Sequence, residues 1–394
     1  MTPLESQQQW RRVRDYLNEN RFALTQHAVR SFPDELRVAG TPLLARPAWL
    51  PDAPVPLADV RLEWEGDGVP APITGAEPEL GHILPRQSDG TPVPSYAGAV
   101  EALARPRLFE NRKCYRLLAA DAATAAPVLS FGRGQYFDVI NICEAIGHEY
   151  AAAALAAPEG AVPAASAMPF RAAVGDPTDL AQRPVMAAIS TLTIRHDRST
   201  GDAEFVLHWR DPERVATGGG LHQVTPVGMF QPSHDACWNE AHDFGLWQSI
   251  VRELSEELLG SSEEYGSDKT PIDYAAWPFN AALEEARSTG RLRVFWMGLG
   301  IDSLTYVSDM LTVAVFDADL FDTVFPRLAA TNEEGHLVAV EDNTGRAFGI
   351  PFRADHVERL TTEEQMQPAG AALLRLAWDH RSALLAHDRG PHPL

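Results

Sequence analysis

The segment spanning residues 247–258 constrains the fold more than any other part of the chain. Its apolar residues recur at the spacing of one helix face, as Trp247, Ile250, Val251, Leu254 and Leu258. Glu253, Glu256 and Glu257 then share the other side of the same helix, within about a turn and a half. A helix with this pattern packs its apolar stripe on a core and carries three carboxylates on the opposite side.

Three glutamates on one helix face need a partner. Like charges three and four residues apart repel each other, so the arrangement lowers helix stability unless a cation lies between them. Mg²⁺ and Mn²⁺ prefer oxygen ligands and also bind the phosphates of a substrate. The pattern therefore predicts a metal platform at Glu253, Glu256 and Glu257.

This helix, together with Gly228 upstream, resembles the signature of the Nudix hydrolase superfamily, whose helix reads Arg-Glu-apolar-x-Glu-Glu. The resemblance implies that Glu253, Glu256 and Glu257 bind Mg²⁺ or Mn²⁺. It also implies that Arg252 orients these glutamates and that the carbonyl of Gly228, at the end of a strand, reaches the metal. The implied reaction is hydrolysis of the pyrophosphate in a nucleoside diphosphate linked to another group.

Two features depart from the family pattern. Leu258 and Leu259 both precede Gly260, where the family has a single residue, and the loop from Gly228 to Arg252 is longer than in the family. These departures support an alternative, a catalytically altered or inactive Nudix-like domain that senses a nucleotide or sugar nucleotide as a transcriptional or metabolic regulator. A third possibility is a Nudix-fold enzyme of a specialised biosynthetic pathway. The intact glutamates favour an enzyme.

The long loop, residues 229–245, is expected to border the substrate. Trp238 is available to stack on a ring of the substrate, and Glu240 is the only glutamate in the loop and is a candidate to replace the loop glutamate of the family. We therefore predict that both residues bind substrate. Asp243 has the position of an N-cap for the glutamate helix.

A late acidic turn supplies a further candidate. Nudix proteins often add a glutamate from a late loop as a metal ligand or general base, and Glu334, or its neighbour Glu333, has that position here. Glu253, Glu334 and Glu240 all remain candidates for the general base. The predicted catalytic residues are Glu253, Glu334 and Arg252.

Strand patterns flank the glutamate helix as the resemblance requires. Alternating or continuous apolar residues predict strands over residues 187–195, 203–210, 221–227, 291–301 and 310–316, and a closing helix over 367–386. The expected fold class is α/β, with a Nudix-like α/β/α sandwich around a mixed sheet in residues 185–394.

The N-terminal part, residues 1–155, is expected to form a smaller α+β domain of unknown role. It begins with a helical pattern over residues 4–31 and includes paired strands over 115–118 and 128–131. The segment 131–154 resembles part of actinobacterial proteins described as putative transcriptional regulators. An Ala- and Pro-rich stretch, residues 156–184, is predicted to be a linker.

Composition limits the kinds of binding partner and the cellular compartment that we expect for this protein. A net charge of −21 opposes an extended DNA-binding surface, whereas a metal still allows a small phosphorylated ligand to bind. Three widely spaced cysteines form no disulfide framework, and no apolar run reaches the roughly 18 residues of a membrane span. We expect a cytoplasmic bacterial protein without a membrane partner, and homodimerisation stays open.

Overall fold

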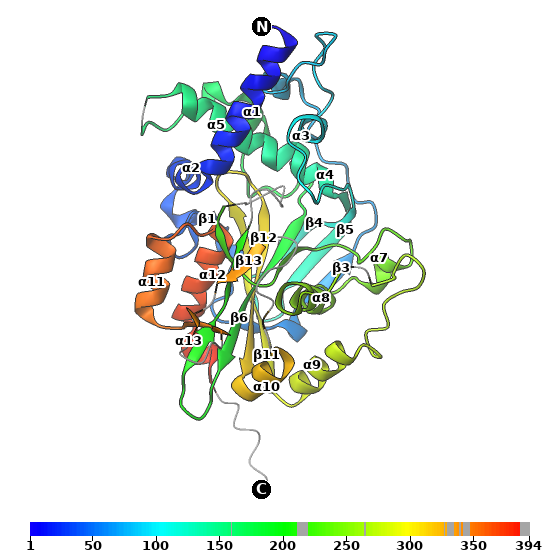
Figure 1. The fold of residues 1–394 in the computed structure, drawn as a ribbon, viewed down its shortest axis with the longest axis vertical. Helices are drawn as coiled ribbons and strands as arrows, with labels where there is room; N and C mark the ends of the chain where they lie inside the picture. The colour runs from blue at the N-terminus through cyan, green and yellow to red at the C-terminus, as the bar shows by residue number, and fades with distance from the viewer. Residues whose placement is uncertain are drawn as a thin grey trace.

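The computed structural model describes residues 1–386, apart from residues 159, 211–219, 264, 327, 329–334, 339 and 342–346. The fold is mixed α/β, with a mixed sheet at its centre and helices beside it (Figure 1). The predicted fold class is confirmed at this level.

Within the described part of the chain the central sheet has eight strands, in the order β1-β11-β12-β6-β7-β16, with β10 also paired to β6 and β2 also paired to β11. Their bounds are β1 (Leu43–Leu44), β2 (Val55–Pro56), β6 (Ala187–His196), β7 (Ala203–Phe205), β10 (Val227–Met229), β11 (Leu292–Asp302), β12 (Ser308–Asp317) and β16 (Ile350–Pro351). Strands β12 and β6 are parallel and the other pairs are antiparallel. The long strands β6, β11 and β12 are buried along most of their length, which explains the largely apolar sequences of β11 and β12.

Smaller sheets surround the central one. They consist of β3 (Arg61–Trp64), β4 (Lys113–Asp121) and β5 (Val128–Gln135), of β8 (Leu207–Arg210), β9 (His222–Val224) and β13 (Gly335–Val338), and of β14 (Val340–Glu341) with β15 (Ala347–Phe348). The predicted antiparallel pairing of β4 with β5 is confirmed. Two strands that the sequence predicted as single are divided. Residues 203–210 form β7 and β8 in different sheets, and residues 221–229 form β9 and β10 on either side of Pro226, which has no N–H to donate to a ladder.

The helices lie at one end and along the sides of the central sheet (Figure 1). At the N-terminal end are α1 (Pro3–Glu19), α2 (Arg21–Ala28), α3 (Tyr96–Leu103), α4 (Tyr136–Val139), the π-helix η7 (Ile140–Glu144), α5 (Ala145–Ala156) and α6 (Pro169–Val174). Along the sheet are α7 (Asn239–His242), α8 (Leu246–Leu259), α9 (Pro278–Ser288), α10 (Ala318–Val324), α11 (Ala354–Thr362), α12 (Pro368–Asp379) and α13 (Arg381–Leu384). Helix α8 packs on β10 and β6, whereas α12 packs on β6, β9, β11 and β12.

The N-terminal residues contribute directly to the central sheet, since β1 and β2 both pair with β11. One hydrophobic cluster includes residues from Trp10 to Leu384. The stretch predicted as a linker contains α6, and the side chains of Phe170 and Arg183 within it are buried. The division into two domains stays a prediction, and the apolar core is continuous across the proposed boundary.

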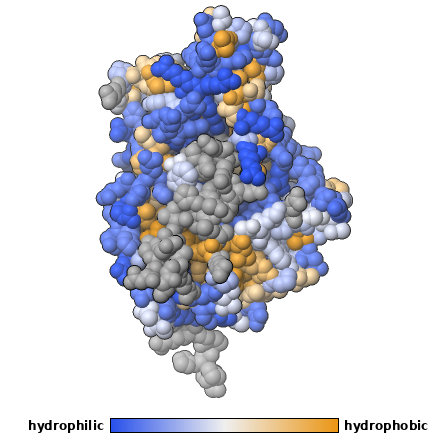
Figure 2. All heavy atoms as spheres, viewed as in Figure 1, coloured by the Kyte–Doolittle hydropathy of each residue, from blue (hydrophilic) through white to orange (hydrophobic). Residues whose placement is uncertain are grey.

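Most of the surface seen in Figure 2 is hydrophilic, with apolar side chains gathered in the lower half of the view. Within the described ranges, no helix combines the length and the apolar character needed to cross a membrane.

A buried ion-pair network joins the N-terminal helices. The carboxylate of Glu144, at the end of η7, is fully buried and contacts the guanidinium groups of Arg14 and Arg21. Burial alone would raise the pKa of Glu144, but the two arginines lower it below its usual value. Arg14 also donates to the hydroxyl of Tyr96 and Arg21 to the side chain of Asn18, but Glu144 is the carboxylate that both arginines share, and removing one partner of a buried ion pair is strongly destabilising.

We predict that Glu144→Ala lowers the free energy of unfolding by about 3–5 kcal/mol, because it leaves two buried arginines without their carboxylate. Urea denaturation of the full chain measures this change. Glu101→Ala is the matched control, since Glu101 pairs with Arg105 on the exposed side of α3, and we expect little change. Equal stability of the two variants would contradict the prediction.

Candidate functional site

The candidate site is a cavity of about 410 Å³ beside the short strand β10. Its walls come from β10, the start of β12, the end of β8, helix α8 and the segment 107–112. The charged residues that line it are Arg107, Glu110, Arg112, Arg210, Glu253, Glu263 and Asp309. Apolar and aromatic side chains, including Phe109, Tyr136 and Met229, complete the lining.

Gly228 and Glu253 meet at this cavity. A Cβ atom placed on Gly228 would lie 1.9 Å from Oε1 of Glu253, so the glutamate carboxylate occupies the space that any other side chain would fill. Gly228 is the middle residue of β10 and not its last residue. Glu253 therefore lies against the strand backbone at the cavity wall, and the approach of the Gly228 carbonyl to a metal stays a prediction.

Glu257 has a different environment. Its carboxylate accepts hydrogen bonds from Oγ1 of Thr225 (2.6 Å) and from the backbone N–H of Val227 (2.9 Å). Only 4% of Glu257 is exposed. The carboxylate thus fastens α8 to β10 and does not line the cavity.

Glu256 lies on a third side of α8. The hydroxyl of Tyr265 donates a hydrogen bond of 2.8 Å to its Oε1. Burial, followed by the charge of Glu263, raises the pKa of Glu256 to about 8.

Among the residues that the structure describes, no three His, Cys, Asp or Glu side chains are grouped to hold a metal ion. Of the predicted metal ligands, Glu253 and Gly228 line the cavity, and Glu256 and Glu257 do not.

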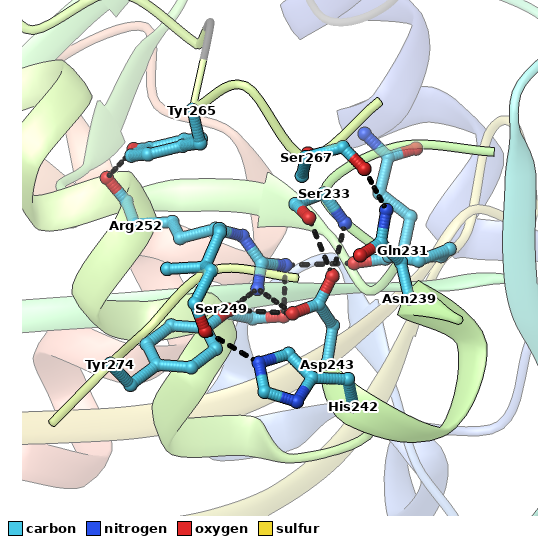
Figure 3. Close-up of polar contacts among 12 residues, drawn as sticks. Gln231, Ser233, Asn239, His242, Asp243, Ser249, Arg252, Tyr265, Ser267 and Tyr274 are labelled. Carbon is cyan, nitrogen blue, oxygen red and sulfur yellow. Dashed lines mark hydrogen bonds and ion pairs between the residues drawn. The ribbon is translucent and has the colours of Figure 1, made fainter. Parts of the chain in front are cut away.

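Arg252 turns toward the loop that precedes α8 (Figure 3). Its guanidinium donates to the hydroxyl of Tyr274 (2.6 Å), to the carbonyl of Gln231 (2.8 Å) and to Oγ of Ser249 (3.2 Å). These hydrogen bonds of the arginine thus join the loop to the helix, while its positive charge still acts on the carboxylates of Glu253 and Glu256.

The prediction that Asp243 caps α8 is wrong, because the N-cap residue is Gly245. The carboxylate of Asp243 instead accepts hydrogen bonds from the backbone and hydroxyl of Ser233 and from the hydroxyl of Tyr274 (Figure 3). These contacts form because the loop folds back over the start of the helix.

The two predicted substrate-binding residues lie outside the Glu253 cavity. Glu240 lines a separate cavity of about 210 Å³, where both of its carboxylate oxygens accept hydrogen bonds of 2.6 Å from Arg133. Trp238 donates from Nε1 to the carbonyl of Ser267 (3.1 Å) and is 42% exposed. Glu334 and Glu333 lie outside the described residues.

Several lining residues were missed in the sequence. The arginines at positions 107 and 112 lie in an irregular segment far from α8 in the chain, and no local pattern connects them to it. Asp309 did carry a signal, since a carboxylate inside an apolar strand is unusual unless it has a partner or a function. Its Oδ1 accepts a hydrogen bond of 2.8 Å from Oγ of Ser190.

Comparison with known proteins adds no relative. No protein-family model matches the chain, and no curated protein matches it. The Nudix resemblance therefore stays a prediction.

We predict that the stability of the wild-type protein falls as the pH rises and that the Glu256→Gln variant does not show this fall. The folded protein holds this proton more tightly than the unfolded chain, because the pKa rises from 4.5 to about 8 on folding. The contribution of the Glu256 carboxyl group to the free energy of unfolding is thus fully present below pH 4.5 and is lost as the pH rises to about 8. Glutamine stays neutral and keeps an acceptor for Tyr265, so the variant is expected to gain stability over wild type across this range.

Thermal unfolding at a series of pH values, in buffer with a chelator, measures this difference. Glu285→Gln on the exposed face of α9 is the matched control and should follow the wild-type pH dependence. Parallel curves for wild type and Glu256→Gln would show that the carboxyl does not titrate in this range.

Proposed function

We propose that the Glu253 cavity binds a nucleoside diphosphate linked to another group, and that the protein hydrolyses its pyrophosphate in a Mg²⁺-dependent reaction. The observation that carries this proposal is the carboxylate of Glu253 held against Gly228 in the wall of an arginine-containing cavity. The Nudix-like α/β/α sandwich is part of the same proposal. Its support is the order of strand β10, loop and helix α8, with α8 packed on β10.

The arginines of the cavity suit a phosphorylated ligand. Guanidinium groups bind phosphate oxygens through two parallel N–H donors, and such charge-assisted hydrogen bonds are stronger than neutral ones. Arg107 is exposed at the cavity, and Arg112 forms an ion pair of 3.2 Å with Glu263. Arg210 reaches the same cavity from β8. Three cations, two from the segment 107–112 and one from β8, thus line one cavity.

The cavity residues also fit a Mg²⁺ or Mn²⁺ ion that enters with the ligand. Mg²⁺ is commonly held by one or two carboxylates together with substrate phosphates, so three protein carboxylates are not required. Glu253 and Glu263 both line the cavity and would hold the ion. When bound, the ion would neutralise and orient the pyrophosphate.

A second candidate function, ligand sensing without turnover, has its own support. Both oxygens of Glu257 accept hydrogen bonds from Thr225 and Val227, and Glu256 accepts one from Tyr265. These two glutamates therefore already have protein partners, as expected of a domain that keeps the motif for its structure. Such a domain would bind the nucleotide or sugar nucleotide and report it to another part of a regulatory system.

We predict that wild-type protein with Mg²⁺ releases phosphate-containing products from at least one member of a panel of nucleotide sugars, NAD, ADP-ribose and dinucleoside polyphosphates. Glu253→Gln should reduce the rate by about 100-fold or more, because it removes the cavity carboxylate next to the reacting groups. Glu101→Gln is the control, since Glu101 pairs with Arg105 on the exposed side of α3 and does not line the cavity, and it should keep the wild-type rate.

The same panel separates the two functions. Thermal stabilisation by one compound without product, retained in Glu253→Gln, would support the sensor and exclude the hydrolase. If no compound yields a product and no compound stabilises the protein, both functions are contradicted.

We further predict that Arg107→Ala weakens ligand binding by about tenfold or more, because a hydrogen bond to a charged group contributes about 1.5–3 kcal/mol. Binding is measured by titration calorimetry with the compound that the panel identifies. Arg105→Ala is a closely matched control, since Arg105 pairs with Glu101 and does not line the cavity. An equal effect of the two variants would show that only the general charge matters.

A further inference from the structure

Asp309 is the one carboxylate on the central strands of the sheet that lines the Glu253 cavity, among the residues the structure describes. Its side chain enters from β12, in the middle of the sheet, and only 7% of the residue is exposed. Oδ1 accepts the hydrogen bond from Ser190, and the structure gives Oδ2 no hydrogen-bond partner among the described residues. A carboxyl group in this position has one oxygen held in place and one available to the contents of the cavity.

The register of the sheet places Asp309 relative to Glu253. Ala188 of β6 pairs with Met229 of β10 on one side and with Asp309 of β12 on the other. Adjacent strands are about 4.8 Å apart, so the backbones at Met229 and Asp309 are separated by roughly 10 Å. Glu253 lies against Gly228, the neighbour of Met229, so the two carboxyl groups reach the cavity from different elements, Glu253 from helix α8 and Asp309 from strand β12.

The surroundings of Asp309 favour proton exchange. Burial is the largest of the effects that raise the pKa of Asp309 to about 7, and the negative charge of Asp302 adds to it. The hydrogen bond from Ser190 and the positive charge of Arg210 act in the opposite direction. The other charged groups at the same cavity are Glu110, Glu253, Glu263, Arg107 and Arg112. A carboxyl group that titrates near neutral pH is suited to act as a general base.

We propose that Asp309 accepts the proton of the water molecule that attacks the pyrophosphate bound in the Glu253 cavity. In this step the water oxygen forms a bond to phosphorus, and the phosphoanhydride P–O bond breaks. The leaving phosphate keeps the electron pair of that bond, and the water proton moves to the Asp309 carboxylate and then to solvent. Glu253 would then be available to hold the ion that enters with the pyrophosphate. This inference rests on the proposed hydrolase function.

The test is the pH dependence of kcat/KM, measured with Mg²⁺ and the panel compound that wild type hydrolyses. In wild type the rate should rise with pH and level off above about pH 7, as Asp309 loses its proton. Asp309→Asn should lose about 100-fold or more in rate and lose this rise, because asparagine keeps the acceptor for Ser190 but cannot take up a proton.

Ser190→Ala tests the same idea without altering Asp309. Loss of the donated hydrogen bond disfavours the carboxylate, so the rise in rate should move to higher pH. Thr191→Val is the matched control, since Thr191 bonds to Thr312 between the same two strands, and it should leave the profile in place. Circular dichroism and urea denaturation confirm that each variant is folded.

The outcomes are distinct. An active wild type whose profile is unchanged in both Asp309→Asn and Ser190→Ala would overturn the role of Asp309 and leave the hydrolase intact. A wild type that releases no product from any compound would overturn the hydrolase, and the role of Asp309 with it.

Discussion

The contact between helix α8 and the short strand β10 holds the candidate site together. Strand β10 pairs with β6 along one edge, and a strand of this kind presents backbone groups that need partners on its other edge. Glu257 supplies one, since its buried carboxylate accepts the N–H of Val227 together with the hydroxyl of Thr225. The same contact fixes the rotation of α8, and that rotation brings Glu253 against Gly228. One glutamate of the motif thus positions another.

The cavity beside this contact combines opposite charges within an acidic protein. Arg107 and Arg112 reach it from the segment 107–112 and Arg210 reaches it from β8, and Glu253 and Asp309 reach it from α8 and β12. The net charge of −21 describes the whole chain and not this volume. Local charge decides which ligand fits, because fields inside a cavity are screened less than those at an open surface. A phosphorylated ligand that arrives with a divalent cation would complement both signs.

The sequence predicted the elements that depend on local patterns. Strand β6 was recognised by the alternation of its apolar residues, β11 and β12 by their largely apolar runs, and helix α8 because its apolar stripe has helical spacing. The direction of polar side chains was harder to predict. Arg252 lies next to Glu253 in the chain, yet its partners are Tyr274 and Gln231, which only the folded loop brings near. Glu240 was expected at the substrate and instead pairs with Arg133, 107 positions away.

The sequence by itself determined that this chain forms a mixed α/β fold and that one amphipathic helix carries three glutamates behind a glycine-containing strand. Apolar periodicity is a local property, so it can be read without knowledge of distant residues. Only the tertiary structure decided which glutamate lines the cavity, and that Asp309 and the arginines lie there too. Those assignments depend on how strands and loops far apart in the chain are packed, and no spacing along the sequence encodes the contact.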